Sequence, residues 1–182
     1  MSSKIPGNNL IELLKTTNSL FTTEDLCVLW GVTNKETLNK TVYRYAKKGL
    51  LYRVRRGLYS KIPLNNLDQK ELGQALLGKN SYLSTESVLA IHGVIVQSIS
   101  SYTFVGETSQ KIQVGSESFL SRKITPQLLL NRSGIVDNVN YSTASLERAV
   151  ADMLYYSPKY YFDNDKPINW DKVKEIKSLV GY

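Results

Sequence analysis

The chain changes from a helical to a strand-like pattern at one glycine, and no other feature limits its fold as strongly. Before Gly49, the apolar residues Leu38, Val42 and Tyr45 recur at spacings of four and three, which predicts the buried face of a helix. After Gly49, the segment LLYRVRRGLYSK is typical of two short strands on either side of an RRG turn. The sequence therefore predicts a helix that leads directly into a β-hairpin.

Two shorter helices are predicted before this one. Residues 8–17 carry leucines at helical spacing, which predicts the first helix. In the segment FTTEDLCVLWG, Thr22 is followed three positions later by Asp25, which is a capping signal, and Gly31 ends the apolar pattern. Three helices followed by a basic hairpin predict a winged helix-turn-helix, in which the second and third helices form the turn motif and the hairpin is the wing.

The net charge of +7 is confined to the first third of the chain. Residues 1–66 contain eleven Lys or Arg and four Asp or Glu, whereas residues 67–182 contain twelve of each kind. This asymmetry indicates a module that binds a polyanion, and nucleic acid and an anionic membrane surface are the two candidates. Membrane binding needs bulky apolar residues that are free to enter the lipid, whereas here the apolar helix face is needed for the core. We therefore expect nucleic-acid binding and no membrane partner.

The basic residues of the third helix and of the wing lie where a winged helix contacts DNA. The side of the helix opposite the apolar face holds Glu36, Lys40, Tyr43, Arg44 and Lys47, with Thr37 and Asn39 on its flanks. These cations by themselves also fit a solvated helix face. The arginines of the hairpin, which stand beside a glycine directly after a basic helix, are not explained by solubility, and they favour DNA binding. We expect the third helix to enter a major groove and the wing to contact the backbone or the minor groove.

A polar, turn-rich connection, PLNNLDQ, predicts a domain boundary near residue 66. Beyond it, helices are expected at DQKELGQALLGK, STESVLAIHG, STASLERAVADMLYYS and NWDKVKEIKSLVG. Short strands are expected at SYLS, YTFVG, KIQVG, FLSRKI and NVNY. The predicted fold class is therefore α+β: a winged helix-turn-helix domain at residues 1–66, followed by a smaller-sheet α/β domain at residues 67–182.

Two details of the second domain are specific expectations. Ser84 is expected to cap the helix of STESVLAIHG. In SLERAVADMLY, the apolar residues form one stripe at helical spacing, which predicts that they face the core. Glu147 and Arg148 of the same segment are expected to lie outside the core.

The sequence predicts no catalytic, metal or cofactor site. It contains one cysteine, Cys27, and one histidine, His92, which are too few for a structural zinc site. No glycine-rich phosphate loop is present. A faint nuclease-like pattern, EIK at residues 175–177 preceded by three aspartates, lies in a helical, lysine-rich segment that is typical of surface charge. We therefore expect a protein that is not an enzyme and that binds no cofactor or metal.

Three features indicate a cytoplasmic protein. No apolar run approaches the ~18–20 residues that a membrane span needs. The start of the chain, MSSKIPGNNL, has neither an apolar core nor a cleavage site, so no signal peptide is expected. A lone cysteine forms no internal disulfide, which fits a reducing compartment.

Three segments resemble one known family. VYRYAKKGLLYRVRRGLYS is similar to the end of the winged-helix domain in AbiEi-type antitoxins, which belong to abortive-infection (type IV) toxin–antitoxin operons. STESVLAIHGVI and YSTASLERAVADMLY resemble the two helical signatures of that family's second domain. The similarity spans most of residues 20–156, and the last predicted helix, residues 169–180, matches no signature of the family.

The resemblance implies a bacterial or archaeal repressor of its own operon that binds repeated sites in double-stranded promoter DNA. It also implies an antitoxin that counteracts a nucleotidyltransferase-type toxin without forming a stable complex with it. By position, the groove-facing residues would be Thr37, Asn39, Lys40, Tyr43, Arg44 and Lys47, and the wing contacts would be Arg53, Arg55 and Arg56. The alternative is a winged-helix transcriptional regulator whose second domain senses a small molecule.

Overall fold

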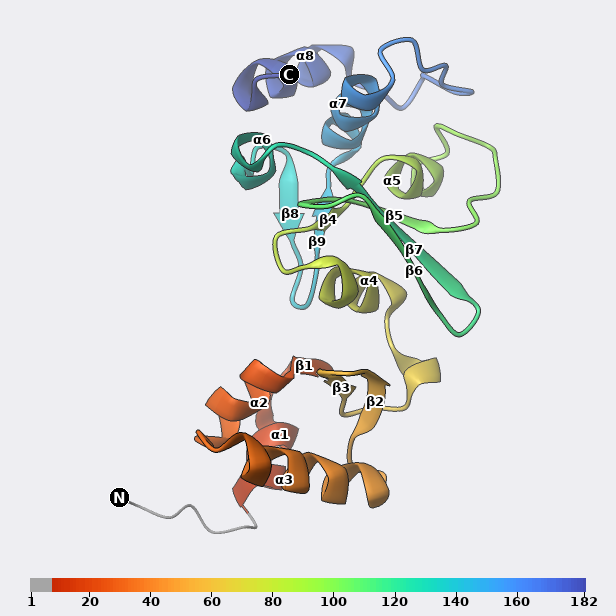
Figure 1. The fold of residues 1–182 in the computed structure, drawn as a ribbon. Helices are drawn as coiled ribbons and strands as arrows, with labels where there is room; N and C mark the ends of the chain where they lie inside the picture. The colour runs from red at the N-terminus through yellow and green to blue at the C-terminus, as the bar shows by residue number, and fades with distance from the viewer. Residues whose placement is uncertain (1–7) are drawn as a thin grey trace. The chain divides into compact units, whose positions relative to one another are not determined.

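The chain divides into two compact units between Asp68 and Gln69, each combining helices with a β-sheet (Figure 1). The computed structural model describes residues 8–182, and residues 1–7, part of the start for which no signal peptide is expected, lie outside the described residues. The fold class is α+β, as the sequence predicts. The two units are called here the N-terminal and the C-terminal unit.

The N-terminal unit contains the helices and the hairpin that the sequence predicts, together with one strand that it does not. The elements are α1 (Asn8–Lys15), β1 (Leu20–Thr22), α2 (Thr23–Trp30), α3 (Lys35–Lys47), β2 (Tyr52–Arg55), β3 (Leu58–Ser60) and the 3-10 helix η1 (Leu64–Asn66). The strands form an antiparallel sheet in the order β1-β3-β2. β1 escapes prediction because its three residues show no alternating pattern and because its partner, β3, is distant in the sequence, so no hairpin turn indicates the pair.

Helix α2 begins and ends at the residues that its sequence signals indicate. The Asp25 backbone N–H donates to Thr22 Oγ1 at 3.1 Å, and the Thr22 N–H donates to Asp25 Oδ2 at 2.8 Å, which completes a capping box. At the other end, Gly31 has a φ of 62°, a left-handed conformation that only glycine adopts without strain. The chain therefore leaves α2 in a fixed direction toward α3.

The core of the N-terminal unit forms around Trp30 and Tyr45. Their rings meet edge to face with centroids 5.4 Å apart, and the Trp30 Nε1–H donates to the Asn9 carbonyl at 3.0 Å. The buried cluster comprises Leu13, Phe21, Leu26, Trp30, Leu38, Val42, Tyr45 and Leu51. Because this cluster takes residues from all three α-helices, it sets the rotation of each helix about its axis.

The C-terminal unit is built on a mixed sheet with strand order β6-β7-β5-β4-β9-β8. Its elements are α4 (Gln69–Leu77), β4 (Tyr82–Leu83), α5 (Glu86–Ile91), β5 (Tyr102–Gly106), β6 (Gln110–Val114), β7 (Glu117–Lys123), α6 (Pro126–Leu130), β8 (Ile135–Asp137), β9 (Ser142–Ala144), α7 (Leu146–Tyr156) and α8 (Trp170–Val180). The pairs β4–β9 and β5–β7 are parallel, and the other pairs are antiparallel. With six strands among the described residues, the sheet is larger than the sequence indicates, because very short strands extend it.

Helices cover both faces of this sheet (Figure 1). On one face α4 approaches so closely that a Cβ on Gly73 would lie 2.4 Å from Phe104 Cζ. On the other face, the Thr103 hydroxyl accepts a hydrogen bond from the Ser87 backbone N–H of α5 at 2.9 Å. Phe104 and Thr103 are neighbours on β5 and therefore point to opposite faces. α7 packs beside α5, and α8 packs on α7.

Two expectations for the strands and helix caps of this unit are wrong. The segment NVNY, residues 138–141, is not a strand but the loop between β8 and β9, closed by a 2.8 Å hydrogen bond from Asn138 N to the Tyr141 carbonyl. Ser84 does not cap α5, because Thr85 occupies the N-cap position and the Ser84 hydroxyl donates to Asp152 instead, at 2.6 Å. The Ser84 hydroxyl, which is typical of a helix cap, thus has a partner from outside its own segment.

We expect Gly73→Ala to destabilise the protein by about 1–3 kcal/mol, because the added methyl group overpacks the interface between α4 and the sheet. Helix propensity by itself predicts the opposite sign, a stabilisation of roughly 0.5–1 kcal/mol. Urea unfolding of the two proteins measures the difference. A Gly73→Ala variant that is more stable than the parent would contradict close packing at this position.

Candidate nucleic-acid interface

The exposed side of α3 is the first part of the candidate interface. Asn34 caps the helix, since its side chain accepts from the backbone N–H of Glu36 at 2.8 Å and of Thr37 at 3.1 Å. Leu38, Thr41, Val42 and Tyr45 are the buried residues of α3. The burial of this side leaves the opposite side of the helix exposed along its whole length.

All nine predicted contact residues are exposed. Six lie on α3, two on β2 and one in the hairpin turn: Thr37, Asn39, Lys40, Tyr43, Arg44, Lys47, Arg53, Arg55 and Arg56. Tyr43 is a large aromatic residue that nevertheless keeps 70% of its surface exposed. The fold therefore brings the six helix residues together on the exposed side of one helix and the three arginines together on the hairpin that follows it.

The hairpin tip is attached to the start of α2. The Gly57 carbonyl accepts from the Thr23 backbone N–H at 3.0 Å and from the Thr23 hydroxyl at 3.3 Å. Gly57 has a φ of 81°, and a Cβ there would lie 3.3 Å from Thr23 Oγ1. The register between β2 and β3 shifts between Arg53 and Arg55, an irregularity that increases the local twist. The arginines of the hairpin thus lie on β2 and on the adjoining turn, whose tip is hydrogen-bonded to α2.

The candidate interface also contains one anion. The Lys40 ammonium lies 2.6 Å from Glu36 Oε1, one helical turn away, and both side chains are about three-quarters exposed. The Arg44 guanidinium lies over the Tyr45 ring, 5.8 Å from its centroid. Glu36 is the only carboxylate in the sequence of α3. The wheel pattern puts it on this side of the helix, but sequence reasoning assigns it no role.

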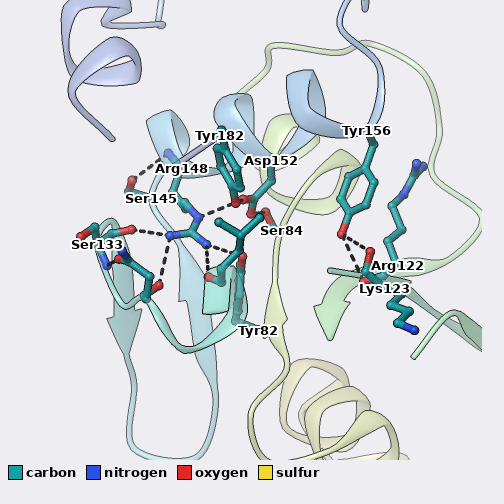
Figure 2. A network of polar contacts seen from close by, with 12 residues as sticks. Tyr82, Ser84, Arg122, Lys123, Ser133, Ser145, Arg148, Asp152, Tyr156 and Tyr182 are labelled. Atoms are coloured by element: carbon teal, nitrogen blue, oxygen red, sulfur yellow. Dashed lines mark hydrogen bonds and ion pairs between the residues drawn. The ribbon is translucent and has the colours of Figure 1, made fainter. Parts of the chain in front are cut away.

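A second polar cluster lies in the interior of the C-terminal unit, where Arg148 of α7 is completely buried (Figure 2). The expectation that Arg148 lies outside the core is therefore wrong. Its Nε–H donates to Asp152 Oδ1 at 2.9 Å, and Asp152 is completely buried as well. The i, i+4 spacing of the two residues is the sequence signal from which this ion pair could have been found.

The five N–H donors of the Arg148 guanidinium have five acceptors. Besides Asp152, they are the Tyr82 hydroxyl at 2.8 Å and the carbonyls of Ser133 at 2.8 Å, Asn131 at 3.2 Å and Leu128 at 3.3 Å. The four acceptors other than Asp152 come from β4, from α6 and from the residues that follow α6. A buried charge that is fully paired in this way joins several elements, and it leaves no donor for a ligand.

Two tyrosines complete the cluster. The rings of Tyr82 and Tyr182 lie 5.3 Å and 5.4 Å from the guanidinium carbon of Arg148, and the Tyr182 hydroxyl donates to Asp152 (Figure 2). Burial, and then the nearby Asp152 carboxylate, raise the pKa of both tyrosines far above the ordinary value. Burial by itself lowers the pKa of Arg148, but Asp152 and the two tyrosines raise it, so the guanidinium stays charged.

The remaining residues with reactive or metal-binding side chains form no common site in the described part of the chain. His92 is the exposed C-cap of α5, and Cys27 is a half-buried free cysteine in α2. Of the nuclease-like aspartates, Asp171 pairs with Lys174 at 3.3 Å and Asp163 accepts from the Val96 N–H at 2.9 Å. Within residues 8–182, no three His, Cys, Asp or Glu side chains gather closely enough to hold a metal ion.

One surface hollow of about 190 Å³ is lined by residues of β5, of the loop before it and of β7. Its lining consists of Ile99, Ser100, Ser101, Tyr102, Glu117 and Ser118. Pockets that bind small molecules usually enclose about 300–1,000 Å³. This hollow is smaller than that range.

In the described part of the chain, no helix has the length and apolar character needed to cross a membrane.

No protein-family model matches the chain, and no curated protein matches it. A crystal structure of the RV2827C protein from Mycobacterium tuberculosis is similar in fold, with a TM-score of 0.52 and 13% sequence identity. The match covers 93% of this chain and 69% of that chain. At this level of identity the similarity concerns the fold alone.

Above about pH 10, we expect stability to fall with pH, because the unfolded chain releases the Tyr82 proton that the folded chain keeps. One such group contributes a slope of about 1.4 kcal/mol per pH unit. Tyr82→Phe should remove this contribution, whereas Tyr161→Phe, at a residue that is 79% exposed, should not. The slopes are obtained from urea unfolding at a series of alkaline pH values. If Tyr82→Phe and the parent have equal slopes, Tyr82 is not a cause of the loss of stability at alkaline pH.

Proposed function

We propose that the N-terminal unit is a winged helix-turn-helix that binds double-stranded DNA. The observation that carries the proposal is the exposure of all nine predicted contact residues on α3 and the hairpin. They lie in the part of the chain, residues 1–66, that holds the whole excess of positive charge. Phosphate contacts supply most of the affinity of such modules, so cations collected on one helix side and one hairpin meet the main requirement.

The dimensions of α3 fit this role. A helix with its side chains is about 10–12 Å across, and the major groove of B-DNA is about 12 Å wide. The predicted contacts run from Thr37 to Lys47, a rise of about 15 Å, which corresponds to roughly four base pairs. Arg44 and Lys40 then provide the side chains that reach base edges, while the wing arginines contact phosphates.

We further propose that the protein represses its own operon and acts as an AbiEi-type antitoxin against a nucleotidyltransferase-type toxin, without forming a stable complex with it. The support is the resemblance of the wing segment and of the α5 and α7 segments to that family. The C-terminal unit has no net charge in the sequence, so electrostatics gives it no reason to lie on DNA. In this proposal the protein is cytoplasmic, has no enzymatic activity, and divides repression and antitoxicity between its two units.

Binding to DNA is expected to weaken with salt, with a slope of log affinity against log salt of roughly −4 to −6 per protomer. Each phosphate contact contributes about −0.9, so Arg53→Ala/Arg56→Ala should make the slope less steep by about 2. The control is Lys111→Ala/Lys123→Ala, which removes two exposed cations from the C-terminal unit. Fluorescence anisotropy with labelled duplex DNA measures both. Equal changes in the two double variants would exclude the hairpin as the contact.

Growth rescue tests the antitoxin role. When the toxin encoded next to this gene is expressed, we expect the full-length Lys40→Ala/Arg44→Ala variant to restore growth as well as the parent, while it no longer represses the promoter. The reason is that both changes affect only the exposed side of α3. A variant that folds normally but does not restore growth would contradict the division of roles. A neighbouring gene for a transporter or a metabolic enzyme would instead favour the small-molecule sensor.

A further inference from the structure

Glu36 lies at the N-terminal end of a helix surface that otherwise suits a polyanion. It shares the exposed side of α3 with Lys40, Tyr43 and Lys47, at helical spacings of four, three and four. Its carboxylate is exposed and pairs with Lys40 at 2.6 Å. An anion at this position repels DNA phosphates, and it pairs with the Lys40 ammonium, which would otherwise contact a phosphate. Its presence in the first turn of this stripe therefore opposes binding to DNA of any sequence.

The pair adds little to the folded state. Exposed ion pairs contribute little to stability, because solvent screens them and both side chains lose freedom. The first turn of α3 is already stabilised by the Asn34 cap, which satisfies the N–H groups of Glu36 and Thr37. As an acidic residue in the first turn, Glu36 also gains from the helix dipole, but this contribution is small and does not depend on its contact with Lys40.

We propose that Glu36 determines the DNA-sequence specificity of the interface by accepting a hydrogen bond from the N4 amino group of a cytosine in the major groove. Carboxylates read cytosine N4, and lysine reads the acceptors O6 and N7 of guanine. Glu36 and Lys40 together therefore match a G·C pair. On that pair their contact with each other is replaced by a contact of Glu36 with cytosine and a contact of Lys40 with guanine. An A·T pair also presents an amino group, adenine N6, but beside the acceptor N7, a pattern that an amide matches and a carboxylate does not. This inference rests on the proposed DNA binding of the N-terminal unit.

The test compares the full-length protein with Glu36→Gln and with Glu24→Gln as the matched control. Glu24 is an exposed carboxylate in the first turn of α2, so both variants remove one negative charge from the same unit. Each protein selects binding sites from a pool of random duplex DNA, and its affinities for the parent's preferred site and for random DNA are then measured. Circular dichroism checks that the helices of each variant are retained.

For Glu36→Gln we expect affinity for random DNA to rise about 3-fold. The preference for the selected site over random DNA should fall by about 5-fold or more, the loss of one base contact. At one position of the selected sequence, a G·C preference should disappear or change to A·T, because glutamine reads adenine. Glu24→Gln should leave both the selected sequence and the preference unchanged.

The inference is wrong if Glu36→Gln selects the same sequence with the same preference, or if Glu24→Gln changes the preference equally, which would make net charge the cause. It is also wrong if the parent binds duplex DNA without selecting any sequence. A parent protein that binds no duplex DNA would overturn the proposed function itself, and this result is distinct from the other three.

Discussion

The contact between Trp30 and Tyr45 is the interaction on which the candidate interface depends. It joins the end of α2 to α3, and the hydrogen bond from the Trp30 indole to the Asn9 carbonyl adds α1 to the same point. A helix packed in this way has one rotation about its axis in which its apolar residues stay out of water. The rotation that buries Tyr45 and Leu38 is also the one that turns Lys40 and Arg44 toward solvent.

The hairpin depends on the same core through α2. The backbone of Thr23, in the first turn of α2, donates to the Gly57 carbonyl at the hairpin tip. A recognition surface made of a helix and a hairpin binds more tightly when both are held in place before binding, because less freedom is lost on association. The hydrogen bond between Thr23 and Gly57 provides this restraint across residues that are distant in the sequence.

The C-terminal unit, in contrast to the N-terminal unit, holds an ion pair in its interior. Arg148 and Asp152 are both completely buried, a position that charged residues occupy only when they are paired and hydrogen-bonded. Their i, i+4 spacing on α7 is visible in the sequence. The burial of the pair is not visible in the sequence. It depends on the Tyr82 hydroxyl from β4 and on the Ser133 carbonyl, which contact α7 only in the folded unit. Sequence reasoning accordingly puts Arg148 on the surface.

The sequence by itself determined the ends of α2, the buried side of α3 and the hairpin that follows it. These features arise from interactions over a few residues, such as the Thr22–Asp25 capping box and the left-handed turn at Gly31. Only the tertiary structure decided the addition of β1 to the sheet, the loop at residues 138–141 and the burial of Arg148. The physical reason is that strand pairing and the burial of a charge require partners from distant parts of the chain. A local sequence pattern does not indicate which residues those partners are.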